Sequence, residues 1–137
     1  EAGAVFGGEE NGGLIFPELQ YCRDGAMSAA KVLEIVAKHG RLSDLLDRIP
    51  SYSQYKTKTR CPDAKKLGVM SELAATARGD RVDTTDGVKI FSGRSWVLVR
   101  PSGTEPIFRV FSEAQTPEEA ERIAESYKKR VEELIRG

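Results

Sequence analysis

The sequence contains little of what many catalytic and metal-binding sites are built from. Its 137 residues include one histidine, His39, and two cysteines, Cys22 and Cys61, whose spacing matches no metal or redox motif. His39 stands at the end of a helical pattern, where a cation can meet the C-terminal dipole, so we expect a capping or surface role rather than catalysis. The two cysteines are expected to be buried free thiols in a reducing compartment. The sequence shows no Ser–His–Asp set, no clustered metal ligands and no Walker-type phosphate loop.

A net charge and a long apolar run are also missing. Lysine and arginine number 21, aspartate and glutamate also number 21, and the formal net charge is zero. A general nucleic-acid binder would need a basic surplus, so no nucleic-acid partner is expected. No run of eighteen apolar residues occurs, so no membrane span is expected either. Any anion site must therefore be local and built from a few placed groups.

The composition that is present indicates a folded protein. Hydrophobic residues make up 39% and charged residues 31% of the chain, and the length is that of one domain or a domain plus a fragment. The chain opens without an initiator methionine or a signal peptide, on a strand pattern with nothing before it. We therefore expect a cytoplasmic protein of which this chain is a piece.

The first fifty residues alternate between short strands and helices. Two strands are predicted at 4–7 and 14–16, around a glycine-rich loop at 7–13. A helix is predicted to start at Asp24 as N-cap and to stop at Gly40, and a short helix follows at 43–48. Ile49-Pro50-Ser51 is the best domain boundary, because proline disfavours helix in the residue before it.

Residues 51–137 predict an α+β domain, an antiparallel sheet with helices packed on one face, preceded by the end of an α/β domain. Asp86-Gly87 is a hairpin signal. Thr116, Pro117 and Glu119 indicate the start of the last helix. One helix is expected to bury the stripe Leu67, Met70, Leu73, Ala74 and Ala77. The predicted elements are strand 52–59, helix 63–78, strands 88–91, 96–99 and 107–111, and a helix from 117.

The segment 100–106, Arg-Pro-Ser-Gly-Thr-Glu-Pro, is predicted to be a loop between two strands that carries groups suited to an anion. Arg100 supplies a fork of donors that matches a phosphate. Ser102 and Thr104 add two hydroxyls. Gly103 lets the backbone turn so that successive N–H groups can face one anion. The same residue types are common in ordinary turns, so residue chemistry alone leaves both interpretations open.

Arg109 follows three residues after this loop and could reach the same pocket. It could equally be an arginine of the sheet face that pairs with a nearby acid.

The glycine-rich loop offers a second candidate site. Glu9 and Asn11 stand two residues apart, so in an extended loop their side chains point the same way. A carboxylate beside an amide can bind adjacent sugar hydroxyls, because each hydroxyl both donates and accepts. A flexible glycine turn with solvated acids explains the same residues.

Taken together, the two loops resemble those of the α-D-phosphohexomutase superfamily. Gly-Glu-Glu-Asn-Gly at 8–12 is similar to the sugar-binding loop of that family, and the loop at 100–106 is similar to its distal phosphate-binding loop. Phe16-Pro17 and the run 23–26, Arg-Asp-Gly-Ala, also resemble the stretch that follows the sugar loop. The superfamily includes phosphomannomutase/phosphoglucomutase and phosphoglucosamine mutase.

The resemblance implies a four-domain enzyme, with residues 1–50 as the last part of the third domain and 51–137 as the fourth. It implies that Glu9 and Asn11 contact the sugar hydroxyls, although the family often has serine where this chain has Asn11. The residues implied to hold the phosphate that is not being transferred are Arg100, Ser102, Gly103, Thr104 and Arg109.

The family moves phosphate between C1 and C6 of a hexose through a hexose 1,6-bisphosphate. A phosphoserine in the first domain and Mg²⁺ on an Asp-rich loop of the second supply the transfer. Neither loop occurs in this chain, so it is expected to be inactive alone. Its implied partners are the phosphosugar substrate and the missing N-terminal domains of the same protein.

Mannose or glucose phosphate is the expected substrate, and glucosamine phosphate is the alternative. A stand-alone α+β ligand-binding module stays open as a different class of function. An RNA-binding domain of split βαβ type is disfavoured by the neutral charge, and because Phe108 and Phe111 would lie on opposite faces of one strand.

Overall fold

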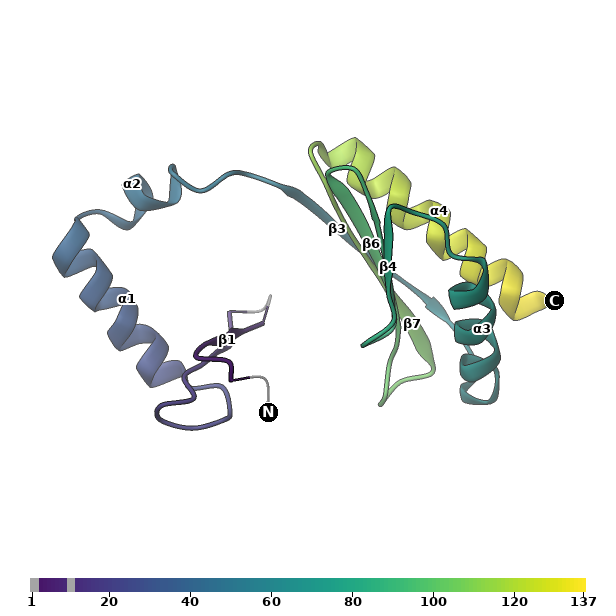
Figure 1. Cartoon of the computed structure of the whole chain (residues 1–137), viewed down its shortest axis with the longest axis horizontal. Helices are drawn as coiled ribbons and strands as arrows, with labels where there is room; N and C mark the ends of the chain where they lie inside the picture. The colour runs from purple at the N-terminus through teal and green to yellow at the C-terminus, as the bar shows by residue number, and fades with distance from the viewer. Residues whose placement is uncertain (1–2, 10–11) are drawn as a thin grey trace. The chain divides into compact units, whose positions relative to one another are not determined.

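The computed structural model describes residues 3–9 and 12–137, which fall into two compact units, Glu1–Pro50 and Ser51–Gly137 (Figure 1). The division follows Pro50, after the short helix α2 (Leu42–Leu46) has ended and before strand β3 (Ser53–Arg60) begins. The two units are described one at a time.

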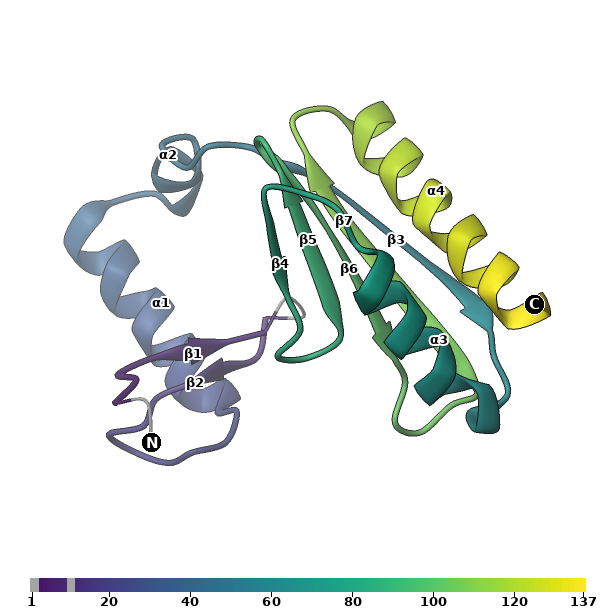
Figure 2. The ribbon, with the colours of Figure 1, turned by 45° about the vertical axis from the view of Figure 1, so that its right-hand side comes forward.

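The first unit begins with a small antiparallel hairpin. Strand β1 (Gly7–Gly8) pairs with β2 (Leu14–Ile15), with Gly7 opposite Ile15 and Gly8 opposite Leu14 (Figure 2). The first strand was expected at residues 4–7, so this prediction was wrong for most of its length. The cause is that glycines form the strand: a Cβ on Gly7 would lie 3.3 Å from the Cβ of Ile15, a close approach that apolar periodicity does not signal.

Helix α1 (Gly25–His39) follows, with the ends that the sequence predicts. The Asp24 carboxylate accepts a hydrogen bond from the Met27 amide at 2.8 Å, as an N-cap does. At the other end Gly40 has a φ of 91°, and its N–H donates to the Val36 carbonyl at 2.9 Å. His39 is exposed in the last turn, where a capping or surface role was expected.

The second unit is built on a five-stranded sheet in which every neighbouring pair is antiparallel. The strands lie in the order β3, β7, β6, β5, β4. Their bounds are β4 (Arg81–Asp83), β5 (Val88–Ser92), β6 (Ser95–Pro101) and β7 (Ile107–Ala114). Helices α3 (Asp63–Thr76) and α4 (Pro117–Arg136) pack together on one face of this sheet (Figures 1 and 2). The predicted α+β class, with helices on one face, is confirmed.

Alternation along the strands places the core between the sheet and the two helices. Along β7, Phe108 and Val110 are fully buried while Arg109 between them is exposed. Helix α4 buries three small or branched residues, Ala120, Ala124 and Val131. Its N-cap Thr116 accepts a hydrogen bond from the Glu119 amide at 3.2 Å, as expected. The cluster is completed by Cys61, Val69, Leu73, Val88, Ile90, Val97 and Val99.

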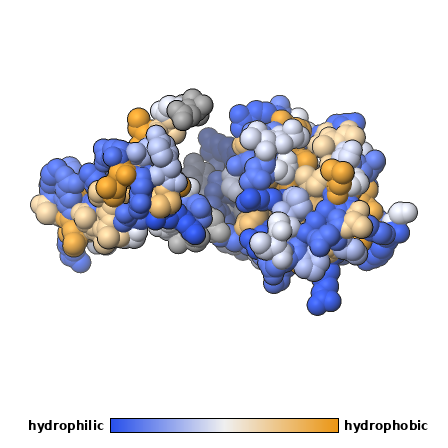
Figure 3. Space-filling model, turned by 90° about the horizontal axis from the view of Figure 1, so that it is seen from below, coloured by the Kyte–Doolittle hydropathy of each residue, from blue (hydrophilic) through white to orange (hydrophobic). Residues whose placement is uncertain are grey.

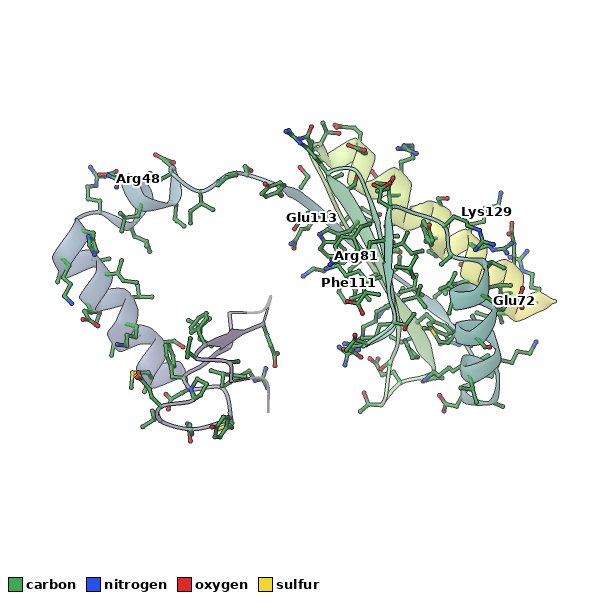
Figure 4. All side chains as sticks on the ribbon, in the orientation of Figure 1. Arg48, Glu72, Arg81, Phe111, Glu113 and Lys129 are labelled. Carbon is green, nitrogen blue, oxygen red and sulfur yellow. The ribbon has the colours of Figure 1, made fainter. Side chains whose placement is uncertain are left out.

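The other face of the sheet is covered by neither α3 nor α4, and cations cover its aromatic side chains. Lys89 lies 3.9 Å from the Trp96 ring centre, and Arg81 lies 3.9 Å from that of Phe91. In Figure 4, Arg81, Phe111 and Glu113 point from the sheet to the side away from α4. We call this side, away from α3 and α4, the open face of the sheet.

Three further sequence expectations are corrected. Arg100 and Pro101 belong to strand β6 rather than to the loop, because Arg100 pairs with Arg109 and Pro101 with Phe108. Leu67 is 83% exposed, whereas Val69 is buried, so the inward stripe of α3 is centred on Val69 and Leu73.

The third correction concerns the two thiols. Cys61 is buried as expected, but Cys22 is exposed because it lies in the open stretch before α1. Within residues 3–9 and 12–137, no helix is both long and apolar enough to cross a membrane.

Candidate functional site

Three cations stand side by side on the open face of the sheet. The ladders place Lys58 of β3 opposite Arg109 of β7, and Arg109 opposite Arg100 of β6. All three are exposed. Residues directly opposite in an antiparallel pair share a face, with their Cβ atoms roughly 5 Å apart. We call these three residues the cation row.

Like charges directly opposite each other destabilise a sheet unless counter-charges lie near them. The row therefore needs anions, and two carboxylates meet it. The Arg100 Nε forms an ion pair with the Asp86 carboxylate at 3.1 Å. The Arg109 guanidinium donates to the Glu105 carboxylate at 2.9 Å. The expected pairing of Arg109 with a nearby acid is thus present, beside the predicted phosphate loop.

The turn at 102–106 joins β6 to β7, beyond Arg100 and Pro101 in β6 and before Arg109 in β7. The Ser102 amide donates to the Ile107 carbonyl at 3.0 Å, which closes the turn. Ser102 is 8% exposed, and its Oγ accepts from the amides of Thr104 and Glu105 at 3.4 and 3.2 Å. These two amides are turned inward. The Ser102 hydroxyl hydrogen is left to donate, as is the hydroxyl of the exposed Thr104.

Gly103 lies at the exposed tip of this turn. Its φ is not positive, so the backbone does not require glycine there. A Cβ built on Gly103 would meet nothing within 4 Å. The expectation that Gly103 supplies a special backbone turn is therefore not what this structure shows. What glycine provides here is open space at the tip, through which a bulky anion could approach the main chain.

Asp86 is brought to Arg100 by the tight turn between β4 and β5. Gly87 in this turn has a φ of 95°, and a Cβ on it would lie 2.5 Å from the Val99 carbonyl oxygen. Only glycine permits this approach of the turn to β6. The turn is also shaped by Asp83, whose carboxylate accepts from the Thr85 amide at 2.9 Å, a bond that lowers the pKa of Asp83.

Because Asp86 occupies Nε, the two Nη groups of Arg100 keep donors for another anion. Arg109 contributes to a hollow of about 350 Å³ together with Lys58 and Glu105. This hollow therefore offers guanidinium and ammonium donors to a small anion, while Arg100, Ser102 and Thr104 lie outside its lining.

The sequence did not single out Lys58 or Asp86 for this site. A signal for Lys58 was the alternation of cations along β3, at Lys56, Lys58 and Arg60, which marks one face of a strand. Asp86 was noticed as part of a hairpin turn, but its contact with Arg100 depends on the strand register.

The other candidate loop lies at the tip of the β1–β2 hairpin in the first unit. The Glu9 amide donates to the Gly13 carbonyl at 2.8 Å, and Gly12 adopts a φ of 85° in the turn. The Glu9 carboxylate accepts from the Arg23 guanidinium at 3.2 Å. Arg23 reaches it because it forms an isolated bridge with Ile15 of β2. Asn11, the other predicted sugar ligand, lies outside the described residues.

Metal ligands do not gather in the described part of the chain. In residues 3–9 and 12–137 no group of three or more His, Cys, Asp or Glu side chains is placed to hold a metal ion. The carboxylates of the site, Asp86 and Glu105, are each paired with an arginine. Among the described residues, the guanidinium and ammonium groups of this site are donors that suit an anion.

Comparison with known proteins gives the same pattern of two segments. Residues 57–129 match the C-terminal domain of phosphoglucomutase/phosphomannomutase, and residues 1–52 match the alpha/beta/alpha domain III of the same enzymes. The chain is 47% identical over its whole length to a phosphoglucomutase/phosphomannomutase of Thermococcus kodakarensis, covering 30% of that protein. It is 43% identical, over 98% of its length, to a probable phosphoglucosamine mutase of Methanothermobacter thermautotrophicus, covering 31% of it.

A solved structure agrees with these relatives. The crystal structure of a phosphoglucomutase/phosphomannomutase family protein from Burkholderia thailandensis superposes with a TM-score of 0.77 at 26% identity. It covers 96% of this chain, and the chain covers 29% of it. This chain thus spans about a third of the length of the relatives it matches. With both segments matched in order and the fold shared, the chain belongs to the phosphoglucomutase/phosphomannomutase family, and its two segments match domain III and the C-terminal domain of that family.

Proposed function

We propose that this chain is the sugar- and phosphate-binding part of a phosphohexomutase, an isomerase that interconverts hexose 1-phosphate and hexose 6-phosphate. The observation that carries the proposal is the cation row Lys58–Arg109–Arg100 beside the Ser102 and Thr104 hydroxyls. A phosphate monoester carries about two negative charges, which such a row can balance without a basic surplus elsewhere.

In this role the β6–β7 hairpin holds the phosphate that is not being transferred. Arg100 and Arg109 bind its oxygens through guanidinium donors, and the hydroxyls of Ser102 and Thr104 add neutral ones. The exposed tip at Gly103 admits the phosphate to the main chain. A site of this kind reads a phosphate and little of the carbon that bears it, so it serves the 1- and the 6-phosphate alike. Positioning of this sort supplies much of a phosphoryl-transfer rate.

The first unit would recognise the sugar. Glu9 and Asn11 are proposed to meet adjacent hydroxyls, with Arg23 orienting the Glu9 carboxylate at 3.2 Å. The phosphoserine and the Mg²⁺ that the family uses are proposed to come from N-terminal domains of the same protein. The chain by itself is therefore expected to bind a hexose 1,6-bisphosphate without turning it over.

Mannose or glucose phosphate is the proposed substrate. Glucosamine phosphate is the second candidate, because the chain is 43% identical to a probable phosphoglucosamine mutase. We place the protein in the cytoplasm, where its free thiols Cys22 and Cys61 would stay reduced.

The test is a titration of the 137-residue chain, followed by amide shifts in NMR. Glucose 1,6-bisphosphate, mannose 6-phosphate and glucosamine 6-phosphate are the ligands, and unphosphorylated glucose is the control. We expect the Ser102, Gly103 and Thr104 signals to move with the phosphorylated ligands. Arg100→Ala should weaken binding by about 10- to 150-fold, the equivalent of one charged hydrogen bond of roughly 1.5–3 kcal/mol.

Arg94→Ala is the matched control, since Arg94 is an exposed arginine of the β5–β6 turn, at the opposite end of β6 from the 102–106 turn. Equal losses in the two variants, or equal shifts with glucose, would overturn the phosphate site and favour a different ligand-binding module. Differences among sugars in the Glu9 shift would rank the substrates. If the chain alone shows no shift, the same titration is repeated with the complete protein. The absence of a shift in the complete protein as well would overturn the proposal.

A further inference from the structure

Behind the 102–106 turn, on the side of helix α3, lies a lysine that the function described above does not use. The Lys66 Nζ donates to the Ser102 carbonyl at 2.6 Å and to the Glu105 carbonyl at 2.7 Å. It also meets the Asp63 carboxylate, one turn earlier in α3, at 2.6 Å. The Lys66 side chain is only 15% exposed, far less than the site arginines Arg100 and Arg109, at 53% and 47%.

An ammonium group has three N–H donors, and two of them donate to these carbonyls, while the Asp63 carboxylate forms an ion pair with the same Nζ. The Lys66 ammonium is thus engaged by groups of the chain itself. Its two backbone acceptors, Ser102 and Glu105, lie three residues apart at the two ends of the exposed tip. A single cation thus ties both ends of the tip to α3.

The direction of these carbonyls decides where one amide points. The peptide group is planar and trans, so its N–H points opposite to its C=O, and no cis peptide occurs in the described residues. Because the Ser102 carbonyl is turned toward Lys66, the N–H of Gly103 is turned away from α3. It faces the exposed tip, where a Cβ on Gly103 would meet nothing within 4 Å.

We propose that Lys66 is a positioning residue of the phosphate site. It holds residues 102–105 in the conformation that presents the Gly103 amide and the Thr104 hydroxyl to the bound phosphate. The proposal rests on the proposed function of this turn. A loop already held in its binding conformation loses less entropy when the ligand arrives, so affinity is gained without a direct contact.

The experiment compares Lys66→Met with Lys65→Met in the full 137-residue chain. Lys65 is the adjacent lysine of α3, and its Nζ donates to the Ile135 carbonyl in α4, away from the turn. Both variants lose one ammonium and its backbone contact on the same helix. The two variants therefore have the same charge. They differ in the carbonyls that lose their donor, which are Ser102 and Glu105 of the turn in one and Ile135 of α4 in the other. Lys66→Arg, which keeps the charge, is the conservative variant and covers the case in which methionine prevents folding.

Two readouts are taken. The first is ¹⁵N relaxation of the Gly103 and Thr104 amides without ligand, which measures the order of the tip. The second is the affinity for inorganic phosphate and for glucose 1,6-bisphosphate. For Lys66→Met we expect lower order at the tip and affinity weaker by roughly tenfold, through lost preorganisation. Lys65→Met should leave both values as in the parent, and Lys66→Arg should recover part of the affinity.

The outcomes separate the two proposals. If the order of the Gly103 and Thr104 amides in Lys66→Met equals that of the parent, Lys66 does not hold the tip. The positioning proposal is then overturned, whatever the chain binds. If the tip becomes less ordered but the phosphate affinity is unchanged, the contact is purely structural, and the positioning role is overturned. An equal loss of affinity in Lys65→Met and Lys66→Met overturns it too. If the parent chain and the complete protein both fail to bind phosphate, the proposed function falls, and the role of Lys66 in it falls too.

Discussion

The two units each contain a helix with a side-chain N-cap, but the two helices differ in how much of their surface is buried. Helix α1 in the first unit and α4 in the second both have an N-cap side chain bonded to a main-chain amide. Yet α4 buries Ala120, Ala124 and Val131, whereas α1 buries none of its residues. Capping and periodicity place a helix in the chain, but a packing partner is needed to bury its apolar face.

The same contrast extends to the whole of each unit. Among the described residues of the first unit, Phe16 is the only buried hydrophobic side chain, while the core cluster lies entirely in the second. Leu33 is 69% exposed and Val5 89%. Figure 3 shows apolar side chains, in orange, on the surface of the first unit. The second unit thus holds the hydrophobic stabilisation, and it is also the unit that carries the proposed phosphate site.

The largest expected effect comes from dividing the chain at the boundary. We expect residues 51–137 alone to unfold cooperatively in urea, because their core is complete without the first unit. Residues 1–50 alone should show no cooperative transition in far-ultraviolet circular dichroism, since they bury little apolar surface. Trp96, the single tryptophan, lies in β6 and reports the second unit by its fluorescence. A cooperative transition in 1–50, or its absence in 51–137, would break the comparison.

The two thiols should differ by a smaller but still large factor. Cys22 is exposed, whereas Cys61 is fully buried and burial raises the pKa of its thiol. With a thiol reagent at pH 8, we expect Cys22 to react at once and Cys61 about a thousandfold more slowly, through unfolding of the second unit. Single-cysteine variants, Cys22→Ser and Cys61→Ala, assign the two phases. Comparable rates for both thiols would contradict the burial of Cys61.

The raised pKa of Cys61 also gives a direction for the pH dependence. The unfolded state releases the thiol proton at lower pH than the folded state does. The stability contributed is therefore present below the unfolded pKa and is lost as the pH rises through the folded pKa. Urea midpoints of the second unit should fall toward alkaline pH, and less so in Cys61→Ala.

The smallest expected effect is the change in unfolding free energy when one of the two helix N-caps is removed. Thr116→Ala should lower the unfolding free energy of the second unit by about 1 kcal/mol, because the Glu119 amide loses its acceptor. Asp24→Ala removes the equivalent acceptor of Met27 in α1 but should leave that transition unchanged. Urea titrations followed by Trp96 fluorescence measure both. A loss of equal size for Asp24→Ala would mean that the two units unfold as one.

Local sequence signals located most of the fold. The caps at Asp24 and Thr116, the glycine stop at Gly40 and the hairpin at Asp86-Gly87 all act within a few residues, and each lies where it was predicted. Where the packing partner mattered, local signals failed: they placed Leu67 in the core and left out Val69. The periodicity of a wide apolar stripe on a helix does not determine which edge of the stripe packs against the sheet.

The sequence by itself determined the residues of the 100–106 motif and the order of the elements apart from strand β4, since both depend on short-range patterns. Only the tertiary structure decided what surrounds that motif. Lys58, Lys66 and Asp86 come from β3, α3 and the β4–β5 turn, far from it in the chain. Antiparallel register brings Lys58 and Asp86 to the open face, and the packing of α3 brings Lys66 behind the turn. Register and packing are set by burying alternate residues over the whole sheet, which no local pattern specifies.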